Sequence, residues 1–189
     1  MLKKHNKTDI LLWIFLISLG FLTGVCLLKK DVQEGFGALA YGTVPYFEFI
    51  DGQNKPITLH MLKGKVWLVN FMSDESIKSY PQVFEVMETL HDKFSKHKNF
   101  RLLSINSGFQ KFSQLSNEEK YNHWHFLNGD RNKVLTLMKE NFYIDDRKDT
   151  FSSGLKLFLV DQNAVIRGYY IISGINDIAQ IERNLIQLL

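Results

Sequence analysis

The sequence is poor in cysteine, proline and glycine. Its 189 residues include one Cys, three Pro and twelve Gly. One thiol excludes an intramolecular disulfide, a dithiol redox pair and a thiolate metal cage, and so little Pro and Gly excludes collagen-like and low-complexity chains. Fifteen Phe, seven Tyr and three Trp, by contrast, supply enough large apolar surface for a folded core. The length fits one ordinary domain with an appendage.

Charge is missing from residues 10–28, a nineteen-residue apolar run with three lysines before it and Lys29-Lys30 after it. At about 1.5 Å per residue, a helix of this length reaches about 28 Å, close to the roughly 30 Å of a membrane's hydrocarbon core. We therefore expect a transmembrane anchor at 10–28, behind a short basic N-terminus at 1–9. The run is longer than a signal-peptide core and lacks a small-x-small site, which favours an uncleaved anchor.

The single cysteine, Cys26, lies inside this anchor. The apolar residues around it favour a plain buried cysteine over a lipid-modified one. The lysines before the helix favour a cytoplasmic N-terminus, so we expect a single-pass protein of the bacterial inner membrane with its C-terminal domain in the periplasm or outside. Gly20 and Gly24 have the spacing of a helix-dimerising pair, which leaves dimerisation through the anchor open.

The rest of the chain is close to neutral. Of the 23 basic and 20 acidic residues, five and one lie in or beside the anchor, which leaves 18 and 19. No cluster of Lys and Arg falls on a predicted helix, so nucleic-acid binding has no electrostatic support. Residues 29–44 mix small and polar residues without a period and are predicted to be a tether. Residues 45–189 are predicted to form the folded domain.

Hydrophobic patterning in that domain predicts an α/β fold. The run 66–72 is apolar throughout, as in a strand covered on both faces. Pro81 opens a helical stretch after it, and a second buried strand follows, so we expect parallel pairing with a right-handed crossover. One small sheet flanked by helices is the expected architecture. Strands are predicted at 46–50, 56–59, 66–72, 101–106, 124–127, 155–161 and 165–170, and helices at 82–94, 132–141 and 176–189.

Several of these segments together resemble a known family. The segments are 51–58, 62–71, 103–105, 124–130, 157–161 and 166–170. Their order, their spacing and their position behind one N-terminal anchor resemble the Sco (SenC) family, membrane-anchored copper chaperones that help to build the copper site of cytochrome oxidase. The resemblance covers residues 45–189. It implies a thioredoxin-like sheet flanked by helices.

The resemblance also implies where copper would bind, and there the sequence departs from the family. Family members use Cys-x-x-x-Cys-Pro after the central strand and one later histidine. Counting along the chain places Ser76, Tyr80 and Ser153 at these three ligand positions, with the proline retained as Pro81. The family's Asp-Pro after the second core strand falls on Gly108-Phe109. Serine and tyrosine are hard, largely protonated donors that soft Cu(I) disfavours, so we expect no cofactor. Copper binding is implied by the family resemblance alone.

These residues predict a degenerate member of the family with a non-catalytic role. We expect a binding or accessory function in respiratory oxidase assembly, with the membrane and an oxidase subunit or another assembly factor as partners. Lys78, Tyr80 and Pro81, in the former metal loop, are the candidate contact residues. An envelope thiol oxidoreductase is the enzyme alternative. It is disfavoured because exchange needs an accessible thiolate and Cys26 is expected in the bilayer.

A second alternative keeps the copper chemistry with different ligands. His123 and His125 flank Trp124, and residues two apart on a strand face the same side. Methionine thioethers from Met61, Met72 or Met87 would have to complete such a site. Structural histidines and core methionines are the commoner roles of these residue types, so we expect no metal at these positions.

Overall fold

The computed structural model describes residues 40–108, 121–144 and 155–189, and the chain divides into two units, Met1–Ala38 and Leu39–Leu189. The predicted anchor, with Cys26, and the Ser153 position lie outside the described residues. Within the described ranges, no helix has the length and hydropathy needed to cross a membrane. The anchor, its orientation and the domain boundaries drawn from the sequence therefore stay predictions.

Seven strands of the described chain form one mixed sheet, in the order β2-β1-β5-β4-β3-β6-β7. The neighbours β3, β4 and β5 run parallel, and the other pairings are antiparallel. The strands are β1 (Glu48–Asp51), β2 (Pro56–Thr58), β3 (Val66–Met72), β4 (Phe100–Asn106), β5 (Trp124–Asn128), β6 (Lys156–Val160) and β7 (Ile166–Ile171). The helices are α2 (Leu59–Leu62), α3 (Asp74–Ser79), α4 (Pro81–Phe94), α5 (Arg131–Asn141), the 3-10 helix η4 (Ile175–Asp177) and α7 (Ile178–Leu188).

The central strand β3 has the bounds that the sequence predicted, and all seven of its side chains are buried. It pairs in parallel with β4, from Val66 opposite Phe100 to Met72 opposite Asn106, which confirms the expected strand–helix–strand pairing. The helix between them, α4, has Pro81 at its first turn, where a missing N–H costs nothing.

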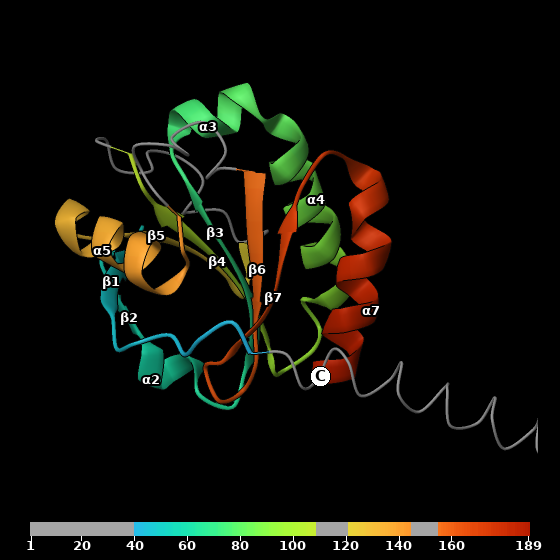
Figure 1. Ribbon diagram of the computed structural model, residues 1–189, viewed down its shortest axis with the longest axis horizontal. Coiled ribbons are helices and arrows are strands. Elements are labelled where there is room, and N and C mark those ends of the chain that lie inside the picture. The colour runs from blue at the N-terminus through green and yellow to red at the C-terminus, as the bar shows by residue number, and fades with distance from the viewer. Residues whose placement is uncertain (1–39, 109–120, 145–154) are drawn as a thin grey trace, which may run out of the picture. The chain divides into compact units, whose positions relative to one another are not determined.

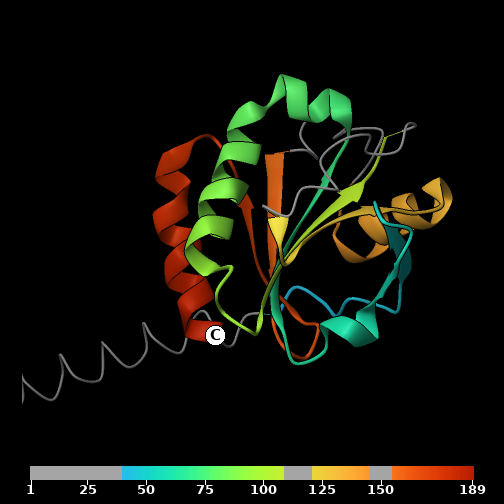
Figure 2. The same ribbon diagram turned by 180° about the vertical axis from the view of Figure 1, so that it is seen from behind.

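Helices cover both faces of the sheet. Figures 1 and 2 show α4 and α7 on one face, and α5 with α2 on the other. The predicted apolar stripe of α4 is confirmed, since its buried residues include Val83, Val86, Met87, Leu90 and Phe94. The opposite face buries a cluster that includes Trp67, Val69, Phe71, Leu103, Leu137 and Phe158. Removing this apolar surface from water is the main contribution to stability of a sheet covered on both sides.

Four local predictions need correction. Residues 74–79 form helix α3, which the patterning missed because DESIKS carries no apolar period. The predicted strand 56–59 stops at Thr58, since Leu59 already begins the short helix α2. The predicted final helix 176–189 is two elements, η4 and α7, with the change at Asp177. Strand β1 also starts two residues later than predicted, at Glu48.

Candidate functional site

The expected site lies where the parallel strands end. Met72, Asn106 and Asn128 are the last residues of β3, β4 and β5, and parallel strands bring their carboxyl ends to one edge of the sheet. Ligands of open α/β sheets usually bind outside this edge. Helix α3 starts directly behind β3, so Ser76 is held at this edge of the sheet.

Ser76, which the sequence analysis predicts at the position of the family's first cysteine, is a helix-capping residue. It forms a capping box with Ser73, the N-cap of α3. The Ser73 N–H donates to Ser76 Oγ at 2.6 Å, and the Ser76 N–H donates to Ser73 Oγ at 3.1 Å. The Ser76 hydroxyl also lies 3.1 Å from the Ser73 carbonyl oxygen, to which it donates. Both hydroxyls thus satisfy N–H groups that a helix start otherwise leaves without partners.

Tyr80, at the position of the second cysteine, is the junction of two helices. It ends α3, where its N–H donates to the Ser76 carbonyl oxygen at 2.8 Å, and it precedes Pro81, the first residue of α4. Its side chain is half-buried, and Lys78 is exposed. The three predicted contact residues Lys78, Tyr80 and Pro81 therefore lie together on one helix–turn–helix segment.

Two asparagines that the sequence analysis did not single out close the strand ends. Asn106 Nδ2 donates to Asn128 Oδ1 at 2.9 Å, and the Gly108 N–H donates to Asn106 Oδ1 at 2.8 Å. Arg131, at the start of α5, donates to the Ser107 carbonyl oxygen at 2.7 Å. The sequence signal for these two residues is an asparagine at the last position of each of two buried strands.

Gly108, where the family has an aspartate, is closely packed. A Cβ on this residue would lie 2.8 Å from Ser73 Cβ and 3.2 Å from Asn106 Oδ1. Contacts under 3.0 Å do not occur between real Cβ atoms, so any side chain at 108 would push the Ser73 backbone aside. Gly108 and the Ser73 side chain therefore pack closely against each other.

A polar chain runs through the buried sheet below this edge. Trp124 Nε1 donates to Ser104 Oγ at 3.0 Å, and Ser104 Oγ donates to Asn70 Oδ1 at 2.9 Å. Asn70 is fully buried, and its Nδ2 has no hydrogen-bond partner among the described residues. An unpaired buried donor costs about 1–3 kcal/mol, which offsets the gain from the Ser104 bond.

His123 and His125, the alternative copper ligands considered from the sequence, lie at the opposite end of the sheet. His123 precedes the first residue of β5, whereas Ser76 follows the last residue of the parallel strand β3. His123 has a φ of 71°, so it is not extended and the two-residue spacing does not give the pair a common face. Its Nδ1 lies 3.0 Å from the Ser95 carbonyl oxygen.

Burial and the nearby Arg101 guanidinium lower the pKa of both histidines below the ordinary value. A cation would meet the same repulsion from Arg101. The three methionines are dispersed, with Met72 and Met87 buried and Met61 57% exposed. Among the described residues, no three His, Cys, Asp or Glu side chains group together as a metal site would require.

The fold is similar to those of several solved structures. No family model matches the chain, and no curated protein matches it. A SCO1/SenC family lipoprotein from Bacillus anthracis str. Ames superposes with a TM-score of 0.65 at 23% identity, covering 78% of this chain and 95% of that one. This chain has a Sco-like thioredoxin fold.

Two further structures agree with the Sco-like fold. BsSco, described as a member of the Sco family of cytochrome c oxidase assembly proteins with a disulfide switch, gives a TM-score of 0.61 at 18% identity, covering 78% of this chain and 95% of that one. The thioredoxin domain of a Bacteroides vulgatus thiol-disulfide oxidoreductase gives 0.55 at 18% identity, with 78% and 98% covered. At these identities the comparison establishes the fold, and function has to be argued from the site.

The scaffold carries hydroxyl groups at Ser76 and Tyr80. A dithiol–disulfide cycle needs two cysteines, and this sequence has one, at position 26. The serine hydroxyl at 76 is engaged in capping, and a phenol at 80 is a hard donor for a soft metal. This edge of the sheet therefore has no thiol pair for disulfide exchange.

Proposed function

We propose that this chain is a membrane-anchored, degenerate Sco-family protein that acts by binding, without copper or thiol chemistry. Its role in this proposal is an accessory one in the assembly of a respiratory cytochrome oxidase. The observation that carries the proposal is the capping box, in which Ser76 occupies the first cysteine position and uses its hydroxyl to start helix α3.

The oxidase is proposed by analogy of fold. BsSco, which shares the fold over most of its length, is described as belonging to a family of cytochrome c oxidase assembly proteins. The Bacillus anthracis relative in fold is described as a lipoprotein, which supports membrane tethering of this scaffold. For this chain we propose tethering through residues 10–28, in the inner membrane, with the N-terminus in the cytoplasm and the domain on the outer side.

The proposed contact surface is the helix–turn–helix segment that replaces the metal loop. Lys78 and Ser79 are exposed, and Tyr80 is half-buried beside them. A tyrosine with a lysine beside it combines a rigid apolar ring with a charge that steers association, which suits contact with a protein. An oxidase subunit or another assembly factor is the proposed partner.

Gene deletion and complementation test this proposal. Deletion of the gene is expected to lower the amount of assembled oxidase in membranes, measured by the haem spectrum and oxidase activity, and the wild-type chain is expected to restore it. Cys26→Ser should restore oxidase equally well, because no thiol step is involved. Lys78→Glu should restore it less well than the matched change Lys96→Glu, which is made at another exposed lysine. Unchanged oxidase on deletion, or failure of Cys26→Ser in a chain that still reaches the membrane, would contradict the proposal.

A further inference from the structure

A groove runs between β1 and α5, on the side of the sheet opposite to α4 (Figures 1 and 2). Two adjoining hollows, of about 780 Å³ and 360 Å³, form it. Both are lined by Glu48, Phe49 and Lys133, so they are continuous, and we call them together the β1–α5 groove. Small-molecule sites usually measure about 300–1,000 Å³, so this groove has room for more than one side chain.

The floor of the groove is apolar and rigid. Phe47 and Phe49 are buried and stack with ring centroids 5.2 Å apart, and Leu137 of α5 is buried beside them. Gly129 packs directly under one ring, because a Cβ on this residue would overlap Phe49. A floor packed this closely keeps its shape whether or not the groove is filled.

The backbone at the start of the first wall is held by hydrogen bonds to two other parts of the chain. The Val44 N–H donates to the Ala164 carbonyl oxygen at 2.8 Å, and the Leu59 N–H donates to the Phe47 carbonyl oxygen at 3.2 Å. Between these two fixed points, Tyr46 lines the groove and remains 57% exposed. An exposed tyrosine ring above an apolar floor is a typical anchor of a protein interface.

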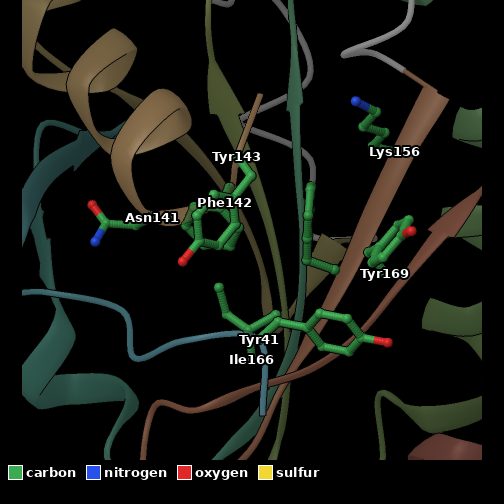
Figure 3. Close-up of a pocket in the computed structure, with 8 residues that line it drawn as sticks. Tyr41, Asn141, Phe142, Tyr143, Lys156, Ile166 and Tyr169 are labelled. Atoms are coloured by element: carbon green, nitrogen blue, oxygen red, sulfur yellow. The ribbon is translucent and has the colours of Figure 1, made fainter. Parts of the chain in front are cut away.

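The second wall is one side of α5. Lys133, Thr136 and Glu140 are exposed and line the groove at the three-to-four spacing of one helix face. Asn141, the last residue of α5, also lines it. Figure 3 shows the Asn141 amide pointing away from a smaller pocket of about 250 Å³. This second hollow, the aromatic pocket, is lined by the rings of Tyr41, Phe142, Tyr143, Phe158 and Tyr169.

The charges that line the β1–α5 groove are mostly negative. Its described lining holds four carboxylates, and Lys133 is its one ammonium group, which gives a net charge of −3. The carboxylates are those of Glu48, Asp51, Asp130 and Glu140. Within the described ranges none of the four forms an ion pair with a basic side chain. Their charge is therefore available to a cationic partner.

The carboxylates are spread along the groove rather than gathered. Asp130 precedes α5 and Glu140 lies in its last turn, so about 15 Å of helix separates them. Over the described chain, no three acidic or histidine side chains group as a metal site requires. An extended polypeptide of about five residues covers the same length, at about 3.3 Å per residue. The charge pattern thus fits an elongated ligand better than a compact cation.

We propose that the β1–α5 groove binds an extended basic segment of a protein partner. In this arrangement, two Lys or Arg residues of the segment meet the carboxylates toward either end of α5, and an apolar side chain between them rests on the floor of the groove. Arginine and lysine side chains reach carboxylates through charge-assisted hydrogen bonds, which set the register of such a segment. The inference rests on the proposed function, that the chain acts by binding.

Fluorescein-labelled decapeptides test the inference on the full-length chain in detergent micelles. The first peptide carries two arginines four positions apart, with leucine midway. The others replace both arginines by glutamate, place the arginines side by side, or replace leucine by serine. We expect fluorescence anisotropy to show the first peptide binding about tenfold more tightly than the glutamate peptide, and about threefold more tightly than each of the other two.

Variants of the groove give effects of opposite sign. Glu48→Gln and Glu140→Gln should each weaken binding of the first peptide about threefold, and Lys133→Gln should strengthen it about threefold because a like charge is removed. Tyr46→Ala should weaken it about fivefold. Glu85→Gln is the matched control, since Glu85 is exposed on α4, over the opposite face of the sheet, and it should change nothing.

Four results would overturn the inference. They are equal binding of the arginine and glutamate peptides, weaker binding in Lys133→Gln, equal losses in Glu85→Gln and Glu140→Gln, and displacement of the peptide by spermine at the same concentration as by unlabelled peptide. A free chain that sediments as a dimer, and that Glu140→Gln dissociates, would equally assign the groove to a second copy. Only purified components are used, so failure here leaves the oxidase role standing, and unchanged oxidase on gene deletion leaves peptide binding standing.

Discussion

The carboxyl edge of the parallel strands and the aromatic pocket differ in how their side chains are used. At the strand ends, Ser73 and Ser76 bond to each other, Asn106 bonds to Asn128, and a Cβ on Gly108 would have no room. In the aromatic pocket, which Tyr41, Phe142, Tyr143, Phe158 and Tyr169 line, three tyrosine rings stay exposed and one of them keeps a costly backbone conformation. The polar groups at the strand ends are thus paired with one another, whereas the exposed rings lie in another part of the fold.

The difference shows what a serine hydroxyl does at position 76. Accepting a backbone N–H at a helix start contributes about 1 kcal/mol to the helix. Residues 73–80 are therefore held as part of the folded structure.

Restoring thiols at the strand ends should produce the largest effect. Ser76→Cys combined with Tyr80→Cys places two thiolates one helical turn apart, and soft sulfur ligands favour Cu(I). We expect Cu(I) affinity to rise by about a thousandfold or more over wild type, measured by competition with a chromophoric chelator. Ser76→Ala with Tyr80→Phe is the matched control and should show no gain. Equal affinity in both double variants would refute the assignment of these positions.

Adding a side chain at Gly108 tests how tightly the strand ends are closed. Gly108→Ala forces its Cβ against Ser73 Cβ, so the free energy of unfolding should fall by about 1–3 kcal/mol in urea denaturation. Gly174→Ala is the control, since a Cβ there meets nothing within 4 Å and the backbone is extended. If both substitutions leave stability unchanged, the edge is looser than the structure indicates.

Relieving backbone strain at Tyr143 should leave stability unchanged or raise it. Tyr143→Gly removes an exposed ring and places glycine, which adopts a left-handed backbone freely, at a φ of 53°, so stability should stay equal or rise by about 0.5 kcal/mol. Thermal unfolding measures the change. A clear loss of stability would mean that Tyr143 is kept for folding.

Acidification should lower the stability of the protein through residues outside both regions. This is the smallest of the expected effects. The histidines with a lowered pKa are His123 and His125, at the other end of the sheet. Because the unfolded histidines keep a pKa near 6.5, they take up protons first, and stability should fall as the pH drops through and below about 6.5. His125→Gln should flatten the dependence of Tm on pH. A Tm that rises on acidification over this range would contradict the direction of both shifts.

Much of the fold follows from local pattern, and most of the site does not. The apolar run of β3, Pro81 at the start of α4 and Asp130 as the N-cap of α5, which accepts from the Lys133 N–H at 3.1 Å, are all readable in sequence. Helix α3 was missed because its start depends on the Ser73–Ser76 capping box rather than on an apolar period. The lack of a thiol pair follows directly from the number of cysteines in the sequence.

The aromatic pocket could not be predicted from the sequence. Tyr41, Tyr143 and Tyr169 are far apart in the chain, and each one alone is an ordinary surface tyrosine. They meet because residues 41–44 pair with the start of β7 while α5 ends nearby. The left-handed backbone at Tyr143 also leaves no trace in composition or period. Such a site depends on tertiary contacts.

The central claim is that this chain acts without binding copper. A Cu(I) titration of the full-length wild-type chain tests it most directly. The chain, in detergent and under reducing conditions, is titrated against a chromophoric chelator, alongside His123→Ala with His125→Ala. We expect wild type and the double variant to behave alike, with no one-to-one complex tighter than about micromolar, since thiolate ligands are missing from the folded domain. A submicromolar one-to-one complex, above all one lost with the two histidines, would contradict the proposed function.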